Sequence, residues 1–343
     1  MSQYNHQNRH NKRKNNAKCN QQYCNKYDQY IEKELTGRQF NKIYHDKFLV
    51  KLTNMEETHN GFKFDDGLNA DTISFNTNIT CSSGGMYFIE ECNMHKWIFY
   101  NSVVGFMYYV RKVTIPDDAR VYVEIDKFKA DKIMLGPRER IDKNTYIKAI
   151  KHDNIIFKNM PDDLKDRDIC MEAIRNDEYN HDALCYVSLE IKDKDMCAES
   201  VKLCGKTLQY VPHHLQDRDM CEDAIKYNGI MLEFVEDSLK DEELCMISVK
   251  CYGHMLKYVP DSIKNREICM EAIKQNNHAF RYVPRGLIDK DMCMEVVGRC
   301  GIALPLVPIE LRDMDVCKAA VEQCDFAIYY VPSKLRKVIH QRN

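Results

Sequence analysis

Residues 197–215 read CAESVKLCGKTLQYVPHHL, and residues 245–263 read CMISVKCYGHMLKYVPDSI, with the same residue types at the same places. The cysteine that opens this pattern recurs every 24 residues, a fixed interval that is typical of a repeat protein. The repeated cysteines are Cys197, Cys221, Cys245, Cys269, Cys293 and Cys317, and Cys170 lies 27 residues before the first of them. The sequence therefore predicts an array of short, similar units.

The first half of each unit has the features of a helix. A small residue often follows three places after the cysteine, and Ile or Val follows after four, which puts three side chains on one helical face. Side chains able to cap free backbone N–H groups stand four places before the cysteine, namely Asp166, Asp193, Asp217, Asp241, Asn265, Asp289 and Asp313. Residues that tolerate the left-handed conformation stand eight places after it, namely Gly205, Gly229, Gly253, Asn277, Gly301 and Asp325. We expect a helix that begins at the cap and ends in a left-handed turn.

The second half of each unit predicts a shorter and irregular helix. Apolar residues recur 11, 14 and 18 places after the cysteine, as in Leu208, Val211 and Leu215, and these spacings are helical. Most units place a proline 15 residues after the cysteine, namely Pro212, Pro260, Pro284, Pro308 and Pro332. Because a proline inside a helix removes a hydrogen bond, we expect this helix to break or restart there.

The same frame extends back to Asp142, with Tyr146 in place of the cysteine, so that residues 142–336 contain eight units. The unit that starts at Asp166 carries three extra residues within 175–181. Neither helix of a unit is long enough to bury its apolar face alone, so neighbouring units must stack. We predict an all-α solenoid of 24-residue two-helix repeats over residues 142–336.

The consensus C-x-x-A-[IV]-x-x-x-G-x-x-L-x-Y-V-P-x-x-L resembles a helical repeat family of unknown function that is found in giant viruses of amoebae and in some bacteria. The resemblance covers residues 142–336, which is more than half of the chain. It implies a fold and no assigned activity. This chain has proline where other members often have alanine or serine.

Two different segments precede the array. Residues 1–36 are predicted to form a disordered basic tail, since residues 1–26 hold six Lys or Arg, seven Asn and no acid. The Lys12-Arg13-Lys14 cluster suggests weak contact with nucleic acid, although simple solvation explains it as well. Strand-like runs follow at 48–52, 85–89, 108–115, 120–125 and 130–135, with a helix-like stretch around 91–100. We therefore predict a small α+β domain over residues 46–140.

Three stretches of this domain are KFLVKLTNMEETHNGFKFDDGLNADTISF at 47–75, CSSGGMYF at 81–88 and VRKVTIPDDARVYVEIDKFKADKIML at 110–135. They resemble the amino-terminal domain that precedes repeat arrays, ankyrin arrays among them, in mimivirus-type giant viruses. That domain has no assigned activity either. The resemblance implies a viral source and a modular plan.

Composition excludes several classes of protein. The chain has 343 residues, and 50 Lys and Arg nearly balance 52 Asp and Glu, so its net charge of −2 gives no overall attraction to nucleic acid or anionic lipid. It contains no apolar run near the roughly 18–20 residues that cross a bilayer, and residues 1–16 lack the apolar core of a signal peptide. The sixteen cysteines are therefore expected to be reduced. We expect a protein of the host cytoplasm, with packaging in virions as a further option.

The strongest enzymatic hypothesis rests on His59, Tyr87 and Glu124. This order is that of ADP-ribosyltransferase-like sites, in which His and Tyr position NAD and Glu stabilises the positive charge that develops on the ribose. Each residue also has an ordinary explanation, since His59 stands in a turn, Tyr87 in an apolar strand and Glu124 at a solvent-facing strand position. Motifs for phosphoryl transfer, serine hydrolysis and zinc proteolysis are missing, and we predict no cofactor.

Other residues allow two interpretations. Cys92 and His95 share a helical face and form either a nucleophile pair or ordinary packing. His6, His10, Cys19 and Cys24 have a loose spacing for zinc, and the repeated cysteines are too far apart to share an ion, so we predict no metal. Tyrosines recur 13 places after the cysteine and either line a binding groove or pack between units, namely Tyr210, Tyr258, Tyr282 and Tyr330.

The most economical interpretation of the sequence is a non-enzymatic adaptor. The repeats offer an extended surface to a viral or host protein, with no membrane contact. The alternative is an NAD-dependent ADP-ribosyltransferase-like enzyme in residues 46–140, for which the solenoid selects substrates.

Overall fold

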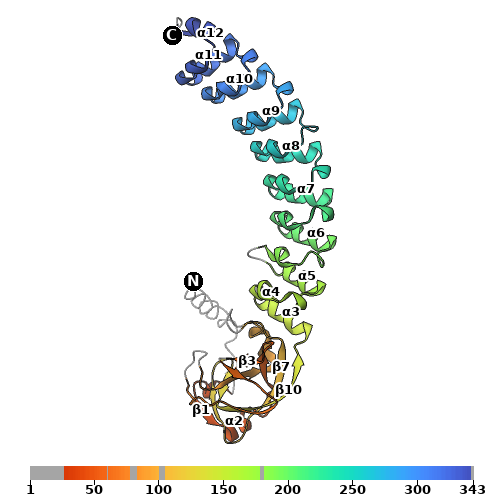
Figure 1. Cartoon of the computed structure of the whole chain (residues 1–343), viewed down its shortest axis with the longest axis vertical. Helices are drawn as coiled ribbons and strands as arrows, with labels where there is room; N and C mark the ends of the chain where they lie inside the picture. Colours follow the sequence, from red (N-terminus) through yellow and green to blue (C-terminus); the bar gives the residue numbers. More distant parts are fainter. Residues whose placement is uncertain (1–26, 60, 78–82, 100–104, 178–180, 341–343) are drawn as a thin grey trace. The chain divides into compact units, whose positions relative to one another are not determined.

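The computed structural model describes residues 27–59, 61–77, 83–99, 105–177 and 181–340. Contacts divide the chain into two compact units, one that ends at Pro161 and one that begins at Asp162. The first unit is rich in β-strands and the second is a stack of helical repeats (Figure 1). The predicted fold class, a small α+β domain followed by an all-α solenoid, is confirmed.

The first unit is built on an antiparallel sheet of eight strands in the order β1-β8-β9-β6-β2-β7-β10-β5. These strands are β1 Glu34–Thr36, β2 Leu49–Thr53, β5 Gly67–Ala70, β6 Met86–Glu90, β7 Tyr109–Thr114, β8 Arg120–Val123, β9 Phe128–Ala130 and β10 Lys132–Arg140. A separate hairpin joins β3 Thr58–His59 to β4 Phe62–Lys63. The helical elements among them are η1 Asp28–Tyr30, α2 Gly37–Ile43 and η2 Glu91–Lys96.

Helix α2 closes the core of this unit. A capping box starts the helix, because Thr36 accepts a hydrogen bond from the Gln39 backbone while the Gln39 side chain accepts one from the Thr36 backbone. Phe40 is fully buried, and its ring meets those of Phe88 and Phe128 edge-on at centroid distances of 5.9 and 5.1 Å. Aromatic packing thus holds the helix on the sheet.

The structure corrects the predicted tail of residues 1–36. Residues 34–36 form the edge strand β1, in which Leu35 lies opposite Val121 of β8. Tyr27 stacks on Tyr44 with ring centroids 4.8 Å apart, so the fold begins at least as early as this residue. The edge strand escaped prediction because it is short and polar. Residues 1–26, with the basic cluster and the four residues considered for zinc, lie outside the described ranges.

The helix expected around residues 91–100 is a 3-10 helix that ends at Lys96. The backbone N–H of Trp97 donates to the Met94 carbonyl at 2.9 Å, which is the shorter i to i+3 pattern of a 3-10 turn. Four of the predicted strand runs are found nearly in place, as β2, β6, β7 and β8. The fifth run, 130–135, spans the end of β9 and the start of β10.

The first helical repeat packs against the β-sheet domain. It consists of α3 Lys143–His152 and α4 Ile155–Asn159, and it falls within the first compact unit. The hydroxyl of Tyr146 donates to the Met107 carbonyl at 3.2 Å, and its ring stacks on Phe106 at a centroid distance of 5.8 Å. Tyrosine therefore replaces the usual cysteine because this position contacts the β-domain. Consequently the compact units divide after Pro161, whereas the predicted boundary lay just before Asp142.

The second unit confirms the predicted first helix of each repeat. These helices are α5 Arg167–Arg175, α6 Lys194–Leu203, α7 Arg218–Tyr227, α8 Glu242–Cys251, α9 Arg266–Gln275, α10 Lys290–Arg299 and α11 Met314–Gln323, followed by α12 Ser333–His340. Each of α5 to α11 begins at its predicted capping residue, as when the Asp193 carboxylate accepts from the Met196 N–H at 2.8 Å. Their repeated cysteines are completely buried, which confirms a packing role.

The second half of each repeat is a 3-10 helix, as the irregular spacing suggested. These are η4 Ala183–Tyr186, η5 Gly205–Tyr210, η7 Gly229–Phe234, η9 Gly253–Tyr258, η10 Asn277–Tyr282, η12 Gly301–Leu306 and η14 Asp325–Tyr330. A further short 3-10 turn often follows the proline position, namely η3 Asp162–Leu164, η6 His213–Leu215, η8 Asp237–Leu239, η11 Arg285–Leu287 and η13 Ile309–Leu311. The predicted break and restart at the proline is confirmed.

The predicted left-handed helix end is wrong. The residue after α6, Cys204, is extended with φ −153°, and Gly205 then opens the 3-10 helix without a positive φ. Glycine is needed for a different reason, which is the close approach of the next repeat. A Cβ on Gly253 would lie 2.2 Å from the carbonyl oxygen of Ala272, and one on Gly301 would lie 2.1 Å from that of Ala320. The glycines therefore permit stacking between neighbouring repeats.

Candidate functional site

Buried polar side chains connect each repeat to the following one. Lys192 donates from its ammonium to the Tyr210 carbonyl at 3.1 Å, and Lys240 donates to the Tyr258 carbonyl at 2.9 Å. Gln216 makes the equivalent bond to the Phe234 carbonyl at 2.9 Å. This position lies 19 residues after the repeated cysteine, and sequence analysis overlooked it although a lysine or glutamine recurs there. These bonds fix the 3-10 helix that carries each of the predicted tyrosines.

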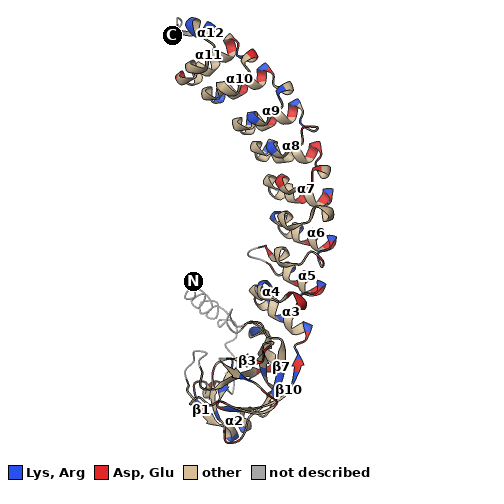
Figure 2. Ribbon diagram, viewed as in Figure 1, with Lys and Arg blue, Asp and Glu red and all other residues tan. Residues whose placement is uncertain are grey.

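A ladder of ion pairs follows the N-terminal ends of the first helices (Figure 2). Arg218 pairs with the next cap, Asp241, at 2.9 Å and with Glu243 at 2.6 Å. The same arrangement recurs in Arg167–Asp193, Lys194–Asp217, Arg266–Asp289 and Lys290–Asp313. Because cations and anions alternate there and are mostly exposed, each pair contributes little and the edge has no dominant charge.

The predicted tyrosine column is partly buried. Tyr210, Tyr258 and Tyr282 are half-buried, whereas Tyr330 is 47% exposed. Consecutive 3-10 helices lie next to one another, so these residues form a row along the array. The row presents aromatic edges to solvent, and its backbone carbonyls belong to the connections between repeats.

An apolar patch lies on η12 and η14, and we define it as Ile302, Leu306, Phe326, Tyr329 and Tyr330. Phe326 is 70% exposed and Tyr329 is 69% exposed, and η12 contacts η14 directly. The positions equivalent to Phe326 in other repeats are Lys206, His254 and His278, and those equivalent to Tyr329 are Gln209, Glu233, Lys257 and Arg281. Large apolar side chains thus gather at positions that carry polar groups elsewhere in the array.

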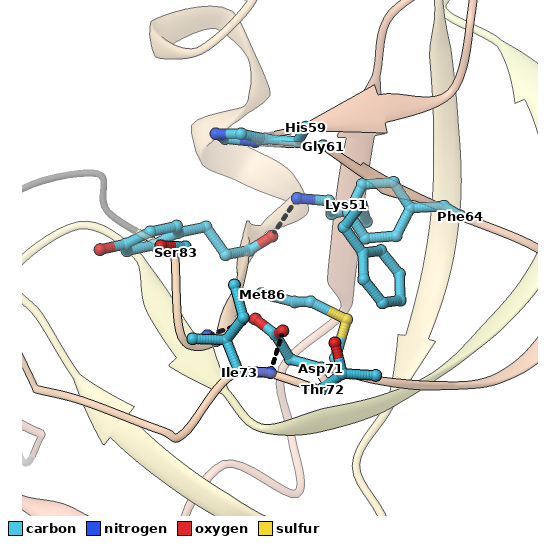
Figure 3. Close-up of a pocket in the computed structure, with 12 residues that line it drawn as sticks. Lys51, His59, Gly61, Phe64, Asp71, Thr72, Ile73, Ser83 and Met86 are labelled. Carbon is cyan, nitrogen blue, oxygen red and sulfur yellow. Dashed lines mark hydrogen bonds between the residues drawn. The ribbon is translucent and has the colours of Figure 1, made fainter.

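In the β-domain, a cavity of about 140 Å³ is lined by Lys51, His59, Phe64, Asp71 and Tyr87 among others (Figure 3). A smaller one of about 50 Å³ shares the first two of these residues and Tyr87, and is otherwise mostly apolar, lined by Leu52, Phe88, Ile89, Trp97, Met107 and Lys127. The structure therefore brings the predicted His59 and Tyr87 to the same cavities. Glu124 is not among the residues that line either one.

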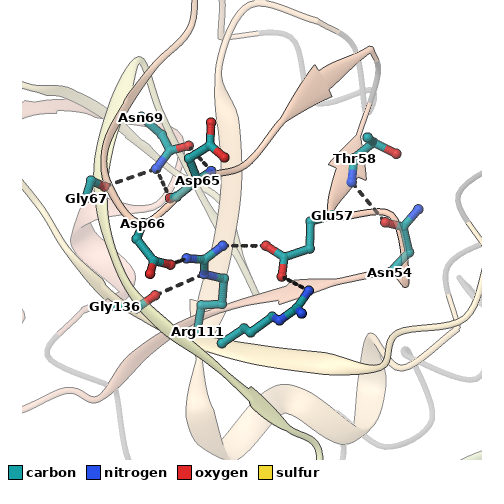
Figure 4. A network of polar contacts seen from close by, with 10 residues as sticks. Asn54, Glu57, Thr58, Asp65, Asp66, Gly67, Asn69, Arg111 and Gly136 are labelled. Carbon is teal, nitrogen blue, oxygen red and sulfur yellow. Dashed lines mark hydrogen bonds and ion pairs between the residues drawn. The ribbon is translucent and has the colours of Figure 1, made fainter.

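A buried arginine holds the hairpin that carries His59 (Figure 4). Arg111 of β7 pairs with Glu57 and Asp66, and its Nε donates to the Gly136 carbonyl at 3.0 Å. Glu57 lies just before β3 and also pairs with Arg138 at 3.2 Å. A buried charge that keeps all these partners fixes the geometry around it, so this network positions one wall of the larger cavity.

The electrostatic surroundings of the three candidate catalytic residues are strongly positive. The Lys127 ammonium lies 4.3 Å from the centroid of the Tyr87 ring and 3.4 Å from the Glu124 carboxylate. Burial, followed by the positive charges of Lys51 and Lys127, lowers the pKa of His59 to about 4. Burial raises the pKa of Glu124 above its ordinary value, against the opposing effect of Lys127. Cations at this site oppose the positive charge that would develop on a ribose, which disfavours the transferase hypothesis.

The remaining candidates are separated or inert. Cys92 is exposed and 3.7 Å from Glu90, whereas His95 packs edge-on against His152 at a centroid distance of 5.4 Å. Burial raises the pKa of the repeated thiols, to about 11 for Cys197 and about 12 for Cys221, so they resist ionisation. The described ranges hold no group of three or more His, Cys, Asp or Glu suited to a metal ion. Nor do they include a helix with the length and apolar character needed to span a bilayer.

Comparison with known proteins identifies the repeats. Residues 142–192, 193–240, 241–288 and 289–336 each match the domain of unknown function DUF4116. The similar curated proteins include two from Acanthamoeba polyphaga mimivirus that are named as ankyrin repeat proteins. R868 is 34% identical over 121 residues, which cover 33% of this chain and 57% of the relative. R896 is 31% identical over 112 residues, which cover 31% of this chain and 32% of the relative.

The chain thus spans just over half the length of one relative and about a third of the other. No solved structure matches it.

Proposed function

Because this chain belongs to the DUF4116 family, whose repeats occupy residues 142–336, we propose that it is a non-enzymatic adaptor that binds a protein partner through its helical repeats. The family and the ankyrin repeat proteins of mimivirus support a repeat protein of giant-virus type. The partner in this proposal is a viral or host protein in the cytoplasm of the infected amoeba.

The observation that carries the proposal is the apolar patch. Exposed aromatic side chains that gather on one surface are typical of the centre of a protein interface. Phe326 and Tyr329 are each more than two-thirds exposed, and they stand where other repeats carry charged or polar residues. The row of half-buried tyrosines, Tyr210, Tyr258 and Tyr282, extends the aromatic character along the neighbouring 3-10 helices and forms the outer part of the proposed surface.

The rest of the array surface supports a contact that is apolar in its centre. The ion-pair ladder is charge-balanced, as shown by Arg218 with Asp241 and Glu243, and gives no strong field to attract a nucleic acid. Specificity would then come from the shape of the patch and its polar rim, while affinity would come from the buried aromatic groups.

A comparison of two chains tests the proposal. The full chain is used for affinity purification from infected amoebae beside a chain that ends at Pro161. Truncation after Pro161 keeps the first repeat, because Tyr146 covers Phe106 and Met107 of the β-domain. The proposal predicts that partners identified by mass spectrometry are lost with residues 162–343. Partners that are retained by the shorter chain in undiminished amounts would refute it.

A further inference from the structure

The β-domain contains lysines at positions where a strand normally buries apolar side chains. Lys51 stands in the middle of β2 and is 3% exposed, and Lys129 in β9 is 0% exposed. Lys127 just before β9 is also buried. Because removal of an ammonium group from water is costly, a fold retains such residues where their charge has a role.

These lysines converge on one side chain. The Lys127 and Lys129 ammonium groups lie 4.3 and 5.3 Å from the centroid of the Tyr87 ring. Lys51 donates to the Tyr87 carbonyl at 2.8 Å and lies 4.5 Å from the centroid of the Phe64 ring. Figure 3 shows Lys51 among the side chains that line the larger cavity, with this hydrogen bond drawn. The cavity therefore combines buried positive charge with aromatic walls.

The acids nearby do not reverse this charge. Asp71 lines the cavity, but its carboxylate accepts from the backbone N–H groups of Ile73 at 2.9 Å and Gly85 at 2.7 Å. Glu124 pairs with Lys127 at 3.4 Å, outside the residues that line the cavity. The lowered pKa of His59 agrees with a positive local field.

We propose that this cavity binds a small organic anion, whose carboxylate or other oxyanion pairs with Lys51 while a planar apolar body lies against Tyr87, Phe64 and His59. A cavity of about 140 Å³ offers roughly ten water-sized positions, which limits the ligand to roughly ten non-hydrogen atoms. The smaller adjoining cavity, lined by Leu52, Trp97 and Met107, extends the apolar part of the site. This binding site is independent of the protein partner proposed for the repeats.

Benzoate and benzamide are suitable probes, because they share a planar ring and a similar size but differ in charge. Titration calorimetry on the full chain is expected to show benzoate binding at least about tenfold tighter than benzamide, as a charged hydrogen bond in a buried site requires. Equal affinities for the two probes, or no binding of benzoate, would overturn the proposal. This comparison uses the unmodified protein and depends on no variant.

A pair of variants locates the site. Lys51→Met removes the buried ammonium, and Lys63→Met removes an exposed one from the neighbouring strand β4. The proposal predicts that Lys51→Met weakens benzoate binding by about tenfold or more, whereas Lys63→Met leaves it unchanged. Unchanged affinity in a folded Lys51→Met protein would place the ligand elsewhere and contradict the assignment. If that variant does not fold, Lys127→Met is measured against the same control.

Discussion

The ammonium of Lys240 donates a 2.9 Å hydrogen bond to the backbone carbonyl of Tyr258, 18 residues further along the chain and in the next repeat. The same ammonium pairs with Asp237 at 2.7 Å, and the lysine is nearly buried. One side chain therefore joins the end of one repeat to the 3-10 helix of the following one. Gln216 forms the corresponding bond one repeat earlier, at 2.9 Å to Phe234.

This connection predicts how the array responds to substitution of Lys240. Lys240→Met is expected to lower the free energy of unfolding by about 1–3 kcal/mol, because the Tyr258 carbonyl loses its donor. Lys240→Gln should recover most of this loss, since glutamine already serves at position 216. Urea unfolding followed by circular dichroism measures both, with the exposed Lys250→Met as the control. Equal stability of the Met and Gln variants would show that the hydrogen bond has no importance.

The repeat glycines give a second prediction. Gly253→Ala should destabilise the array by about 1–3 kcal/mol, because the new methyl group would collide with the Ala272 carbonyl and separate two repeats. Gly298 lies in α10 with nothing within 4 Å of its added Cβ, so Gly298→Ala should stabilise by about 0.5–1 kcal/mol. The same unfolding experiment tests the pair. Two substitutions with the same sign would contradict the stacking explanation.

Docking of the first repeat on the β-domain is tested at Tyr146. Tyr146→Phe removes the hydrogen bond to Met107 and should cost about 1 kcal/mol, whereas Tyr146→Cys, the residue of later repeats, should cost about 2–5 kcal/mol. Trp97 is the single tryptophan of the chain and lies in this unit, so its fluorescence reports the relevant transition. An unaltered fluorescence transition in Tyr146→Cys would mean that the repeat does not stabilise the domain.

The buried thiols predict the pH dependence of stability. Burial raises the pKa of Cys221 from 9.0 to about 12 and that of Cys245 to about 11, so the folded state keeps protons that the unfolded state releases. Their contribution is complete below pH 9.0 and is lost as the pH rises toward 11 to 12. The urea midpoint of the array should therefore fall between about pH 8 and about pH 10.5, and less so in Cys221→Ala. A midpoint that rises over this range would contradict the burial of the thiols.

Much of the repeat fold could be predicted because its signals are local. Asp193 caps α6 through its own neighbour Met196, and such a contact is written in three adjacent residues. The role of Gly253 could not be predicted in the same way, since the atom that excludes a side chain belongs to Ala272 in the next repeat. Residues 34–36 were missed for a related reason, because an edge strand depends on its partner β8.

The candidate site in the β-domain shows the same limit. Sequence order placed His59 and Tyr87 together, and both line the larger cavity. It did not reveal Lys127, which approaches both Glu124 and the Tyr87 ring and changes the chemistry that the site favours. A lysine in a strand is normally taken to face solvent, so its burial becomes evident only in three dimensions.

The central claim is that the apolar patch binds a protein partner. The most direct measurement compares affinity purifications from infected amoebae with the unmodified chain, a Phe326→Asp/Tyr329→Asp variant and an Ile125→Asp control, which alters an apolar residue of the β-domain that is 79% exposed. Circular dichroism confirms that all three are folded. Our account predicts that the control recovers the same partners as the unmodified chain and that the patch variant recovers about tenfold less. Equal recovery by the patch variant would contradict it.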